Sequence, residues 1–190
     1  MRIISGEFRG RTVVAPKNFD LRPTTDMAKE GLFNILNNQL DFTDSSVLDL
    51  FAGIGSISLE CASRGSSDIV SVEMNAKHAS FIKQTALSLK IKGMKVLTSE
   101  VRDFLKIANR SFDLIFADPP YNLPWISEVP NLIFASKAVG PETLVVVEHP
   151  GEVDFSQHPN FFRLSKYGKV HFSFFRLPSQ ELISAGLTTF

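Results

Sequence analysis

Apolar and polar residues follow two different periods along this chain, and the period changes at regular intervals. Compact apolar runs are typical of buried strands and predict strands at residues 45–50, 69–73, 95–98, 112–117 and 143–148. The segments between them show helical spacing and predict helices at residues 28–36, 56–64, 76–89, 104–108 and 128–137. Because strands and helices alternate, we expect an α/β fold with a doubly wound, mostly parallel sheet.

The two ends of the chain depart from this pattern. Residues 1–22 mix short apolar pairs with glycines and predict a small, hairpin-like and basic N-terminal extension. Residues 161–164 and 169–177 predict a closing antiparallel strand pair, joined through Tyr167 and Gly168. We therefore expect the extension at 1–22, the main domain at 23–177 and a loosely ordered tail at 178–190.

Composition narrows the class of protein. The single cysteine, Cys61, excludes an internal disulfide and fits a reducing cytoplasm. No apolar run reaches the roughly 18 residues of a membrane-spanning helix, and the first residues carry charge too early for a signal peptide. The histidines are scattered without metal-ligand spacing, so we expect no metal site. We expect a monomeric cytoplasmic protein.

Charge is balanced overall but uneven locally. The chain has 20 Lys and Arg against 20 Asp and Glu, which argues against a protein that coats nucleic acid by charge alone. Within residues 1–22, however, cations outnumber the two acids, Glu7 and Asp20. This imbalance is compatible both with a phosphate-binding surface and with a solvated edge that binds nothing, and composition does not distinguish the two. The candidate phosphate-binding residues are Arg2, Arg9, Arg11 and Arg22.

A glycine turn follows the first predicted strand. Gly53 and Gly55 carry no side chain, so the backbone can approach a ligand closely there. A dinucleotide-binding turn has a third glycine where this chain has Ser58, which weakens a pyrophosphate site. S-adenosylmethionine has no pyrophosphate and does not need that glycine. The alternative is a tight turn without a ligand.

Two acidic residues mark the ends of the next two predicted strands. Glu73 ends the second strand at the spacing of a carboxylate that binds both hydroxyls of a ribose, and an exposed charge is the alternative. Asp103 follows the third strand, where it either meets the amino group of an adenine or caps the next helix. We leave both alternatives open for Asp103.

The run Asp118-Pro119-Pro120-Tyr121 ends the fourth predicted strand. The amino group of a nucleobase is a poor nucleophile because its lone pair is delocalised into the ring. Hydrogen bonds to the Asp118 carboxylate and the Pro119 carbonyl would draw that nitrogen towards a tetrahedral shape and free the lone pair. Pro120 would stiffen the turn, and Tyr121 would stack on the extruded base. A chance turn of this composition is the alternative.

These motifs carry a family resemblance. Asp118-Pro-Pro-Tyr121, behind Phe51-Ala-Gly-Ile-Gly55, resembles the amino-methyltransferases with the D/N-P-P-Y/F motif. Residues 1–11, 21–26 and 29–36 closely resemble the bacterial 16S ribosomal RNA guanine-N2 methyltransferase family. The resemblance covers about residues 1–177.

The resemblance implies a class I methyltransferase fold, which is Rossmann-like, with S-adenosylmethionine as methyl donor. It implies that the acceptor is a guanine of 16S rRNA, either naked or in a small-subunit assembly intermediate. The catalytic candidates are Asp118, Pro119 and Tyr121. The cofactor-binding candidates are Thr24, Asp49, Phe51, Gly53, Gly55, Glu73 and Asp103.

The chain departs from the family in one run. Where the family commonly has Asp-Arg-x-Arg-Glu, this chain has Asp26-Met-Ala-Lys-Glu30. Met27 loses one positive charge, and Lys29 keeps a charge without the planar fork that grips phosphate. We therefore expect this run to contact RNA more weakly than it does in the family.

Three other functions compete with this interpretation. An adenine-N6 methyltransferase of DNA would have nearly the same site, and only the N-terminal blocks argue against it. An NAD-dependent oxidoreductase would explain the glycine turn and Glu73 but not Asp118-Pro-Pro-Tyr121. A non-catalytic RNA-binding assembly protein would be expected to have lost one of these motifs, and both are intact.

Overall fold

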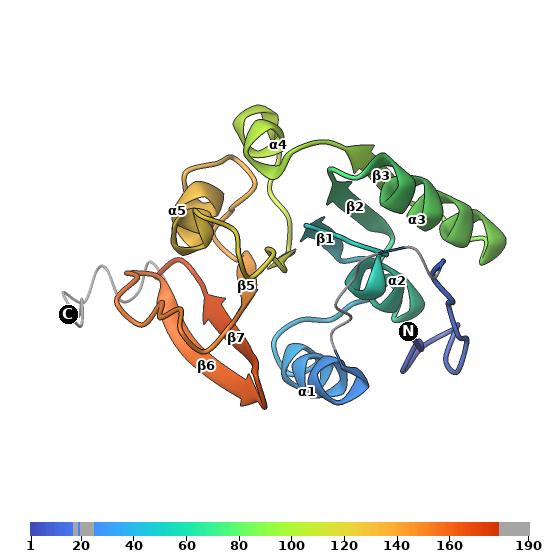
Figure 1. The fold of residues 1–190 in the computed structure, drawn as a ribbon, viewed down its shortest axis with the longest axis horizontal. Coiled ribbons are helices and arrows are strands. Elements are labelled where there is room, and N and C mark those ends of the chain that lie inside the picture. Colours follow the sequence, from blue (N-terminus) through green and yellow to red (C-terminus); the bar gives the residue numbers. More distant parts are fainter. Residues whose placement is uncertain (17–18, 20–24, 179–190) are drawn as a thin grey trace.

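The computed structural model describes residues 1–16, 19 and 25–178 of the chain. One seven-stranded sheet runs through it in the order β3-β2-β1-β4-β5-β7-β6 (Figure 1). β1 to β5 pair in parallel, whereas β7 pairs antiparallel with β5 and β6 antiparallel with β7. The fold class predicted from the sequence is therefore confirmed. The strands are β1 Ser46–Leu50, β2 Asp68–Glu73, β3 Met94–Thr98, β4 Leu114–Ala117, β5 Leu144–His149, β6 Phe161–Tyr167 and β7 Val170–Phe175.

Helices cover both faces of the sheet. The helices are α1 Asp26–Leu36, α2 Ser56–Ser63, α3 Ala76–Ser88, α4 Val101–Ile107 and α5 Val129–Phe134, with a short 3-10 helix at Ile126–Glu128. Apolar residues of α1 and α2 form one core with alternate residues of the strands. The intervening strand residues face the other way and form a second core with α4 and α5. α3 packs on Val96 of β3, on the same side as α2 (Figure 1).

Two helices begin or end at residues that the apolar pattern alone did not predict. α4 begins at Val101 because the Glu100 side chain accepts hydrogen bonds from the backbone N–H groups of Arg102 and Asp103, at 2.6 and 3.2 Å. The alternative that Asp103 caps this helix is wrong. α5 ends at Phe134. The Ser136 hydroxyl donates a hydrogen bond to the Ile133 carbonyl at 2.7 Å and so competes with the backbone hydrogen bond that would continue the helix.

The N-terminal extension is anchored by backbone hydrogen bonds. An antiparallel bridge joins Arg2 to Thr12, which matches the hairpin-like form expected from the sequence. The N–H groups of Ile4 and Ser5 donate to the two carboxylate oxygens of Glu60 in α2, at 2.8 and 3.0 Å. Part of the extension is therefore fixed to α2 rather than free in solvent.

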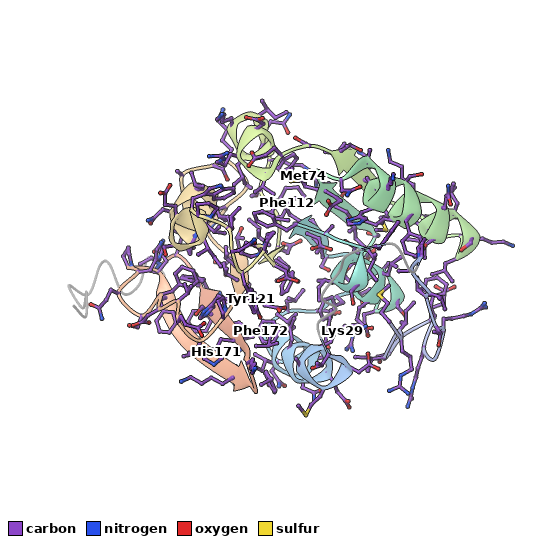
Figure 2. All side chains as sticks on the ribbon, viewed as in Figure 1. Lys29, Met74, Phe112, Tyr121, His171 and Phe172 are labelled. Atoms are coloured by element: carbon purple, nitrogen blue, oxygen red, sulfur yellow. The ribbon has the colours of Figure 1, made fainter. Side chains whose placement is uncertain are left out.

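A buried cluster of charges lies beneath the extension. Glu60 is fully buried and accepts hydrogen bonds from the Arg64 guanidinium, and Lys29 Nζ lies 3.5 Å from its carboxylate. Lys29 also donates to the Arg2 carbonyl at 2.6 Å and is only 1% exposed. A buried, paired ammonium group cannot reach a phosphate, so Lys29 makes no RNA contact in this conformation, in line with the weaker contact expected of this run (Figure 2 labels Lys29). Met27 of the same run is 66% exposed.

Candidate functional site

Three predicted motifs meet at one edge of the sheet. β1 lies between β2 and β4, and the register aligns Leu50 with Val72 on one side and with Ala117 on the other. The glycine turn directly follows β1, Asp118 directly follows β4, and Glu73 is the last residue of β2, so the three lie together at the carboxyl edge. The strand order reverses at β1, and in folds of this class ligands bind at that reversal.

The glycine turn has left-handed backbone at several positions. Phe51, Gly53 and Gly55 have φ angles of 60°, 57° and 78°. A Cβ atom on Gly55 would lie 3.1 Å from Ile82 of α3, so this position has both a conformational and a steric need for glycine. The turn thereby brings α2 and α3 close together at the carboxyl edge.

Asp49 lies beneath the glycine turn. Its carboxylate accepts hydrogen bonds from the N–H and the hydroxyl of Ser58, at 3.1 and 2.5 Å, and that hydroxyl also bonds Ser71. Burial, opposed by the Ser58 hydrogen bonds, raises the pKa of Asp49 to about 7. Ser58, which occupies the place of the missing third glycine, thus supports the turn through its side chain.

Glu73 connects β2 to the glycine turn. Its carboxylate accepts hydrogen bonds from the N–H of Gly53 at 2.8 Å and the N–H of Asn75 at 2.7 Å. Its other neighbour is His78, whose Nδ1 lies 3.8 Å away. Glu73 is 7% exposed, and Met74, the next residue, is 71% exposed and therefore available to a ligand beside the carboxylate (Figure 2).

The run Asp118-Pro-Pro-Tyr121 forms a turn directly after β4. The Asp118 N–H donates to the Leu50 carbonyl at 3.3 Å, which fixes the turn to the end of β1. Asp118 is half-buried. The Tyr121 hydroxyl donates to the Glu148 carboxylate at 3.3 Å, and Glu148 is a buried residue near the end of β5. Tyr121 lies in the middle of the molecule in Figure 2, near Phe172 of β7, which pairs with Glu148.

Asp103 and Trp125 lie farther along the same edge. Asp103 is largely exposed in α4 and pairs with Lys106 at 3.0 Å. Trp125 is half-buried against the core of α4 and α5, with its ring 6.0 Å from Phe51 and beneath the Arg102 guanidinium. Trp125 thus packs on the core and also contacts the residue that opens the glycine turn.

The basic candidates lie on the N-terminal extension. Arg9 and Arg11 are exposed, and the side chain of Arg2 is 60% exposed and lies 3.9 Å from Asp26. Arg22 and Thr24 lie outside the described residues, as does the tail beyond Pro178.

Sequence reasoning missed three residues at the carboxyl edge. Glu100 follows β3 more closely than Asp103 does, Glu148 lies near the end of β5, and Met74 directly follows Glu73. Counting acids from the end of each predicted strand would have found Glu100 and Glu148. Only the exposure of Met74 in the folded chain distinguishes it from a core methionine.

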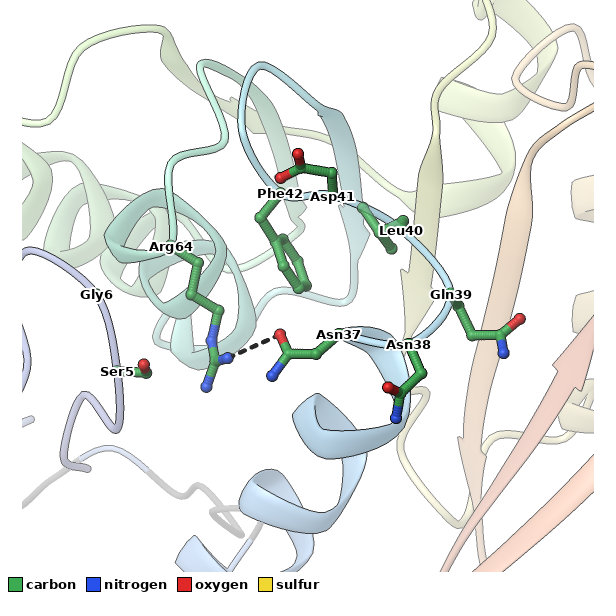
Figure 3. Close-up of a pocket in the computed structure, with 9 residues that line it drawn as sticks. All are labelled: Ser5, Gly6, Asn37, Asn38, Gln39, Leu40, Asp41, Phe42 and Arg64. Atoms are coloured by element: carbon green, nitrogen blue, oxygen red, sulfur yellow. Dashed lines mark hydrogen bonds between the residues drawn. The ribbon is translucent and has the colours of Figure 1, made fainter.

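One described cavity lies away from this edge. It has a volume of about 690 Å³ and lies beside residues 37–42, which connect α1 to the start of β1 (Figure 3). Arg64 in its wall is already bound to Glu60 and to Asn37. In the described part of the chain no group of three or more His, Cys, Asp or Glu could hold a metal ion. None of the described helices is long and apolar enough to cross a membrane.

Comparison with known proteins identifies the family. The model of the family described as "Conserved hypothetical protein 95" matches residues 1–176. The chain belongs to this family. The match covers the glycine turn, Glu73 and Asp118-Pro-Pro-Tyr121, and it includes the N-terminal extension.

Its relatives are methyltransferases by name. Ribosomal RNA small subunit methyltransferase D of Escherichia coli strain K12 is 33% identical over 148 residues, 78% of this chain and 74% of the relative. The protein of that name from Buchnera aphidicola subsp. Baizongia pistaciae is 28% identical over 179 residues, 92% of this chain and 91% of the relative. The solved structure of yhhF from Escherichia coli has a TM-score of 0.82 at 29% identity and covers 95% of this chain and 99% of its own. The family resemblance predicted from the sequence is therefore confirmed, and the chain belongs with methyltransferases.

Proposed function

We propose that this protein transfers a methyl group from S-adenosylmethionine to the N2 amino group of a guanine in 16S ribosomal RNA. The observation that carries the proposal is the position of Asp118-Pro-Pro-Tyr121, fixed to the end of β1 beside the glycine turn and Glu73. A donor site and an amino-acceptor motif thus share one edge of the sheet. The names of the two relatives support rRNA as the acceptor.

The residues at this edge fit S-adenosylmethionine. Two backbone N–H groups hold the Glu73 carboxylate in place, which leaves its remaining lone pairs to accept hydrogen bonds from the ribose hydroxyls. The exposed Met74 side chain offers an apolar surface for the adenine ring. Phe51, Gly53 and Gly55 line the turn, and Asp49 supports it from below. We keep Thr24 and Asp103 as further candidates for cofactor contact.

The acceptor side follows from the chemistry of an amino nitrogen. The Asp118 carboxylate and the Pro119 carbonyl accept hydrogen bonds from the two amino hydrogens, and Tyr121 stacks on the base. As positive charge develops on the nitrogen in the transition state, its interaction with Asp118 strengthens. S-adenosylmethionine, when bound, would supply an electrophilic methyl group: its S–CH3 bond would break as the N–CH3 bond forms, and S-adenosylhomocysteine would leave. The methylated nitrogen would then release one proton, to water or to Asp118. Glu148 holds the Tyr121 ring in place through its hydroxyl.

The RNA side of the proposal uses the basic extension. Arg2, Arg9 and Arg11 project from a segment that is fixed to α2, so their charges lie at defined places on the surface. Together with Arg22 they would contact the phosphates of 16S rRNA or of a small-subunit assembly intermediate. An rRNA substrate implies action in the cytoplasm, and we propose that the protein acts there as a monomer.

Variants at Asp118 test the chemical step. Asp118→Ala removes the acceptor, and single-turnover methyl transfer should fall by about 10²–10³-fold, the scale of losing one preorganised transition-state contact. Asp118→Asn should be milder because its amide oxygen still accepts a hydrogen bond. Binding of S-adenosylmethionine, measured by calorimetry, should persist in both variants. Near-normal transfer by Asp118→Ala, with the product on guanine N2, would leave the motif as a structural turn.

A further inference from the structure

The last two strands carry an unusual charge distribution. From residue 155 to residue 178 the sequence contains no Asp or Glu, although acids and bases are equal in number over the whole chain. A chain segment of this length without a single carboxylate concentrates positive charge on β6, β7 and their flanks. Its basic residues are Arg163, Lys166, Lys169 and Arg176.

The register of the strands places part of this charge beside the catalytic motif. β7 runs antiparallel to β5 and pairs His171 with His149, the last residue of β5. The turn between β6 and β7 therefore lies at the carboxyl edge, where Asp118 follows β4. From β4 to β6 is three strand spacings, or about 14 Å. The nucleotides that flank a base bound at Asp118 can reach across this distance.

The side chains on this hairpin are available to a partner. Lys166 and Lys169 are exposed, and Phe162 and Leu164 of β6 are 47% and 39% exposed. Asp154 is the neighbouring acid whose pKa is lowered, first by the backbone N–H of Ser156 and more weakly by charges that include Lys166. The tip thus combines exposed ammonium groups with exposed apolar surface, a combination typical of RNA-binding surfaces.

The tip is held in a defined position against α1. The Tyr167 ring packs directly on Gly31, where a Cβ atom would lie 2.2 Å from the ring. Tyr167 also lies 6.0 Å from Phe172 of β7. Lys29 of α1 anchors the N-terminal extension, and two residues correspond to roughly 200° around a helix. The extension and the hairpin tip therefore contact opposite sides of α1, as Figure 1 shows.

We propose that the β6–β7 hairpin tip is a second RNA-binding surface, on which Lys166 and Lys169 bind backbone phosphates next to the target nucleotide. The proposal rests on the proposed function, because it takes RNA as the substrate. The extension then holds the RNA on one side of α1 and the hairpin tip holds it on the other. Two separated contacts would fix the direction of the strand while the base enters the site at Asp118.

The test compares two double variants. Lys166→Gln with Lys169→Gln removes the proposed contacts, and Lys83→Gln with Lys92→Gln removes two exposed cations on and just beyond α3 as a matched control. Binding of a 16S rRNA fragment is measured by fluorescence anisotropy over a range of salt concentrations. The hairpin variant should lower the magnitude of the log–log salt slope by about 1.4–1.8, and the control should not change it.

Methyl transfer separates this inference from the proposed function. The hairpin variant should raise the KM for rRNA by about ten-fold and leave the affinity for S-adenosylmethionine unchanged. An unchanged salt slope, or an equal loss in the control, would overturn the hairpin surface. If RNA binding depends on the hairpin but the wild-type protein places no methyl group on guanine, the proposed function fails and the RNA surface stands. Circular dichroism spectra that match wild type exclude misfolding as the cause.

Discussion

The Glu73 carboxylate accepts a hydrogen bond from the Gly53 N–H and is also proposed to bind the ribose hydroxyls. Glu73→Ala removes the ribose hydrogen bonds, so affinity for S-adenosylmethionine should fall at least ten-fold, since a hydrogen bond to a charged group contributes about 1.5–3 kcal/mol. Glu73→Gln should be milder because one oxygen remains. Calorimetry measures both, with Glu142→Gln, an exposed acid near the start of β5, as control. Wild-type affinity in Glu73→Ala would exclude Glu73 as the ribose acceptor.

Asp49 predicts a pH dependence of stability. Its folded pKa of about 7 lies above its ordinary value of 3.8, so between these values the folded state binds more protons than the unfolded state. This contribution to stability is fully present below about pH 4 and is lost as pH rises towards 7. Asp49→Asn cannot titrate, and its amide oxygen still accepts the Ser58 hydrogen bond.

The free energies of unfolding of wild type and Asp49→Asn, measured by urea denaturation from pH 4 to pH 8, should therefore diverge. The wild type should lose stability relative to the variant by up to about 1.4 kcal/mol per pH unit in this window. Parallel curves across the whole range would show that Asp49 is ionised in the folded protein at all of these pH values.

At the residue scale, the sequence predicted the motifs but not the residues that form hydrogen bonds with them. Gly53, Glu73 and Asp118 lie at or just after the ends of strands that apolar runs reveal, so their place at one edge follows from parallel pairing alone. Their partners come from distant segments: Tyr121 meets Glu148 and Asp49 meets Ser58 through contacts that no local pattern encodes. The burial of Lys29 could not be predicted for the same reason, because it depends on Glu60 and on the extension.

At the scale of elements, the extension depends on a close approach at one glycine. Gly6 and Gly10 both have positive φ, at 80° and 81°. A Cβ atom on Gly6 would lie 1.7 Å from the Ser63 carbonyl oxygen of α2, whereas one on Gly10 meets nothing within 4 Å. Alanine substitutions at the two glycines therefore distinguish the effect of backbone strain from the effect of losing the contact between the extension and α2.

Gly10→Ala should cost only the backbone strain of a left-handed residue, about 1–2 kcal/mol. Gly6→Ala should in addition displace the extension from α2 and weaken rRNA binding, with affinity for S-adenosylmethionine unchanged. Hydrogen exchange of the Ile4 and Ser5 amides reports the docking directly, because both donate to Glu60. Equal exchange and equal RNA affinity in the two variants would show that the extension does not need this contact.

The apolar pattern predicted β1, β2, β4 and β5 because each is a compact apolar run. It also predicted β3 and the antiparallel closing pair, although β6 contains exposed polar residues and continues to Tyr167. It predicted helix ends less well, since these depend on single hydrogen bonds such as those of Glu100 and Ser136. The position of the hairpin tip beside α1 could not be predicted from the sequence. It depends on the order of the strands in the sheet and on the absence of a side chain at Gly31.

At the scale of the whole molecule, the proposed donor site and the acceptor motif share the carboxyl edge of the sheet, and the two basic surfaces lie on either side of α1. Because the chain has zero net charge, it would bind RNA through local charge, and this binding should weaken steeply as the salt concentration rises. Replacing Arg2, Arg9 and Arg11 together should lower the magnitude of the salt slope by about 2.1–2.7. An unchanged slope would move the RNA-binding site away from the extension.

The central claim is the identity of the methylated atom. The most direct measurement incubates the purified protein with labelled S-adenosylmethionine and either small ribosomal subunits, naked 16S rRNA or DNA, and then digests the product to nucleosides. The expected result is label in N2-methylguanosine from the ribosomal substrates, formed about 10²–10³-fold more slowly when Asp118→Ala replaces the wild type. Label in N6-methyladenine from DNA, with none in guanosine from RNA, would contradict it.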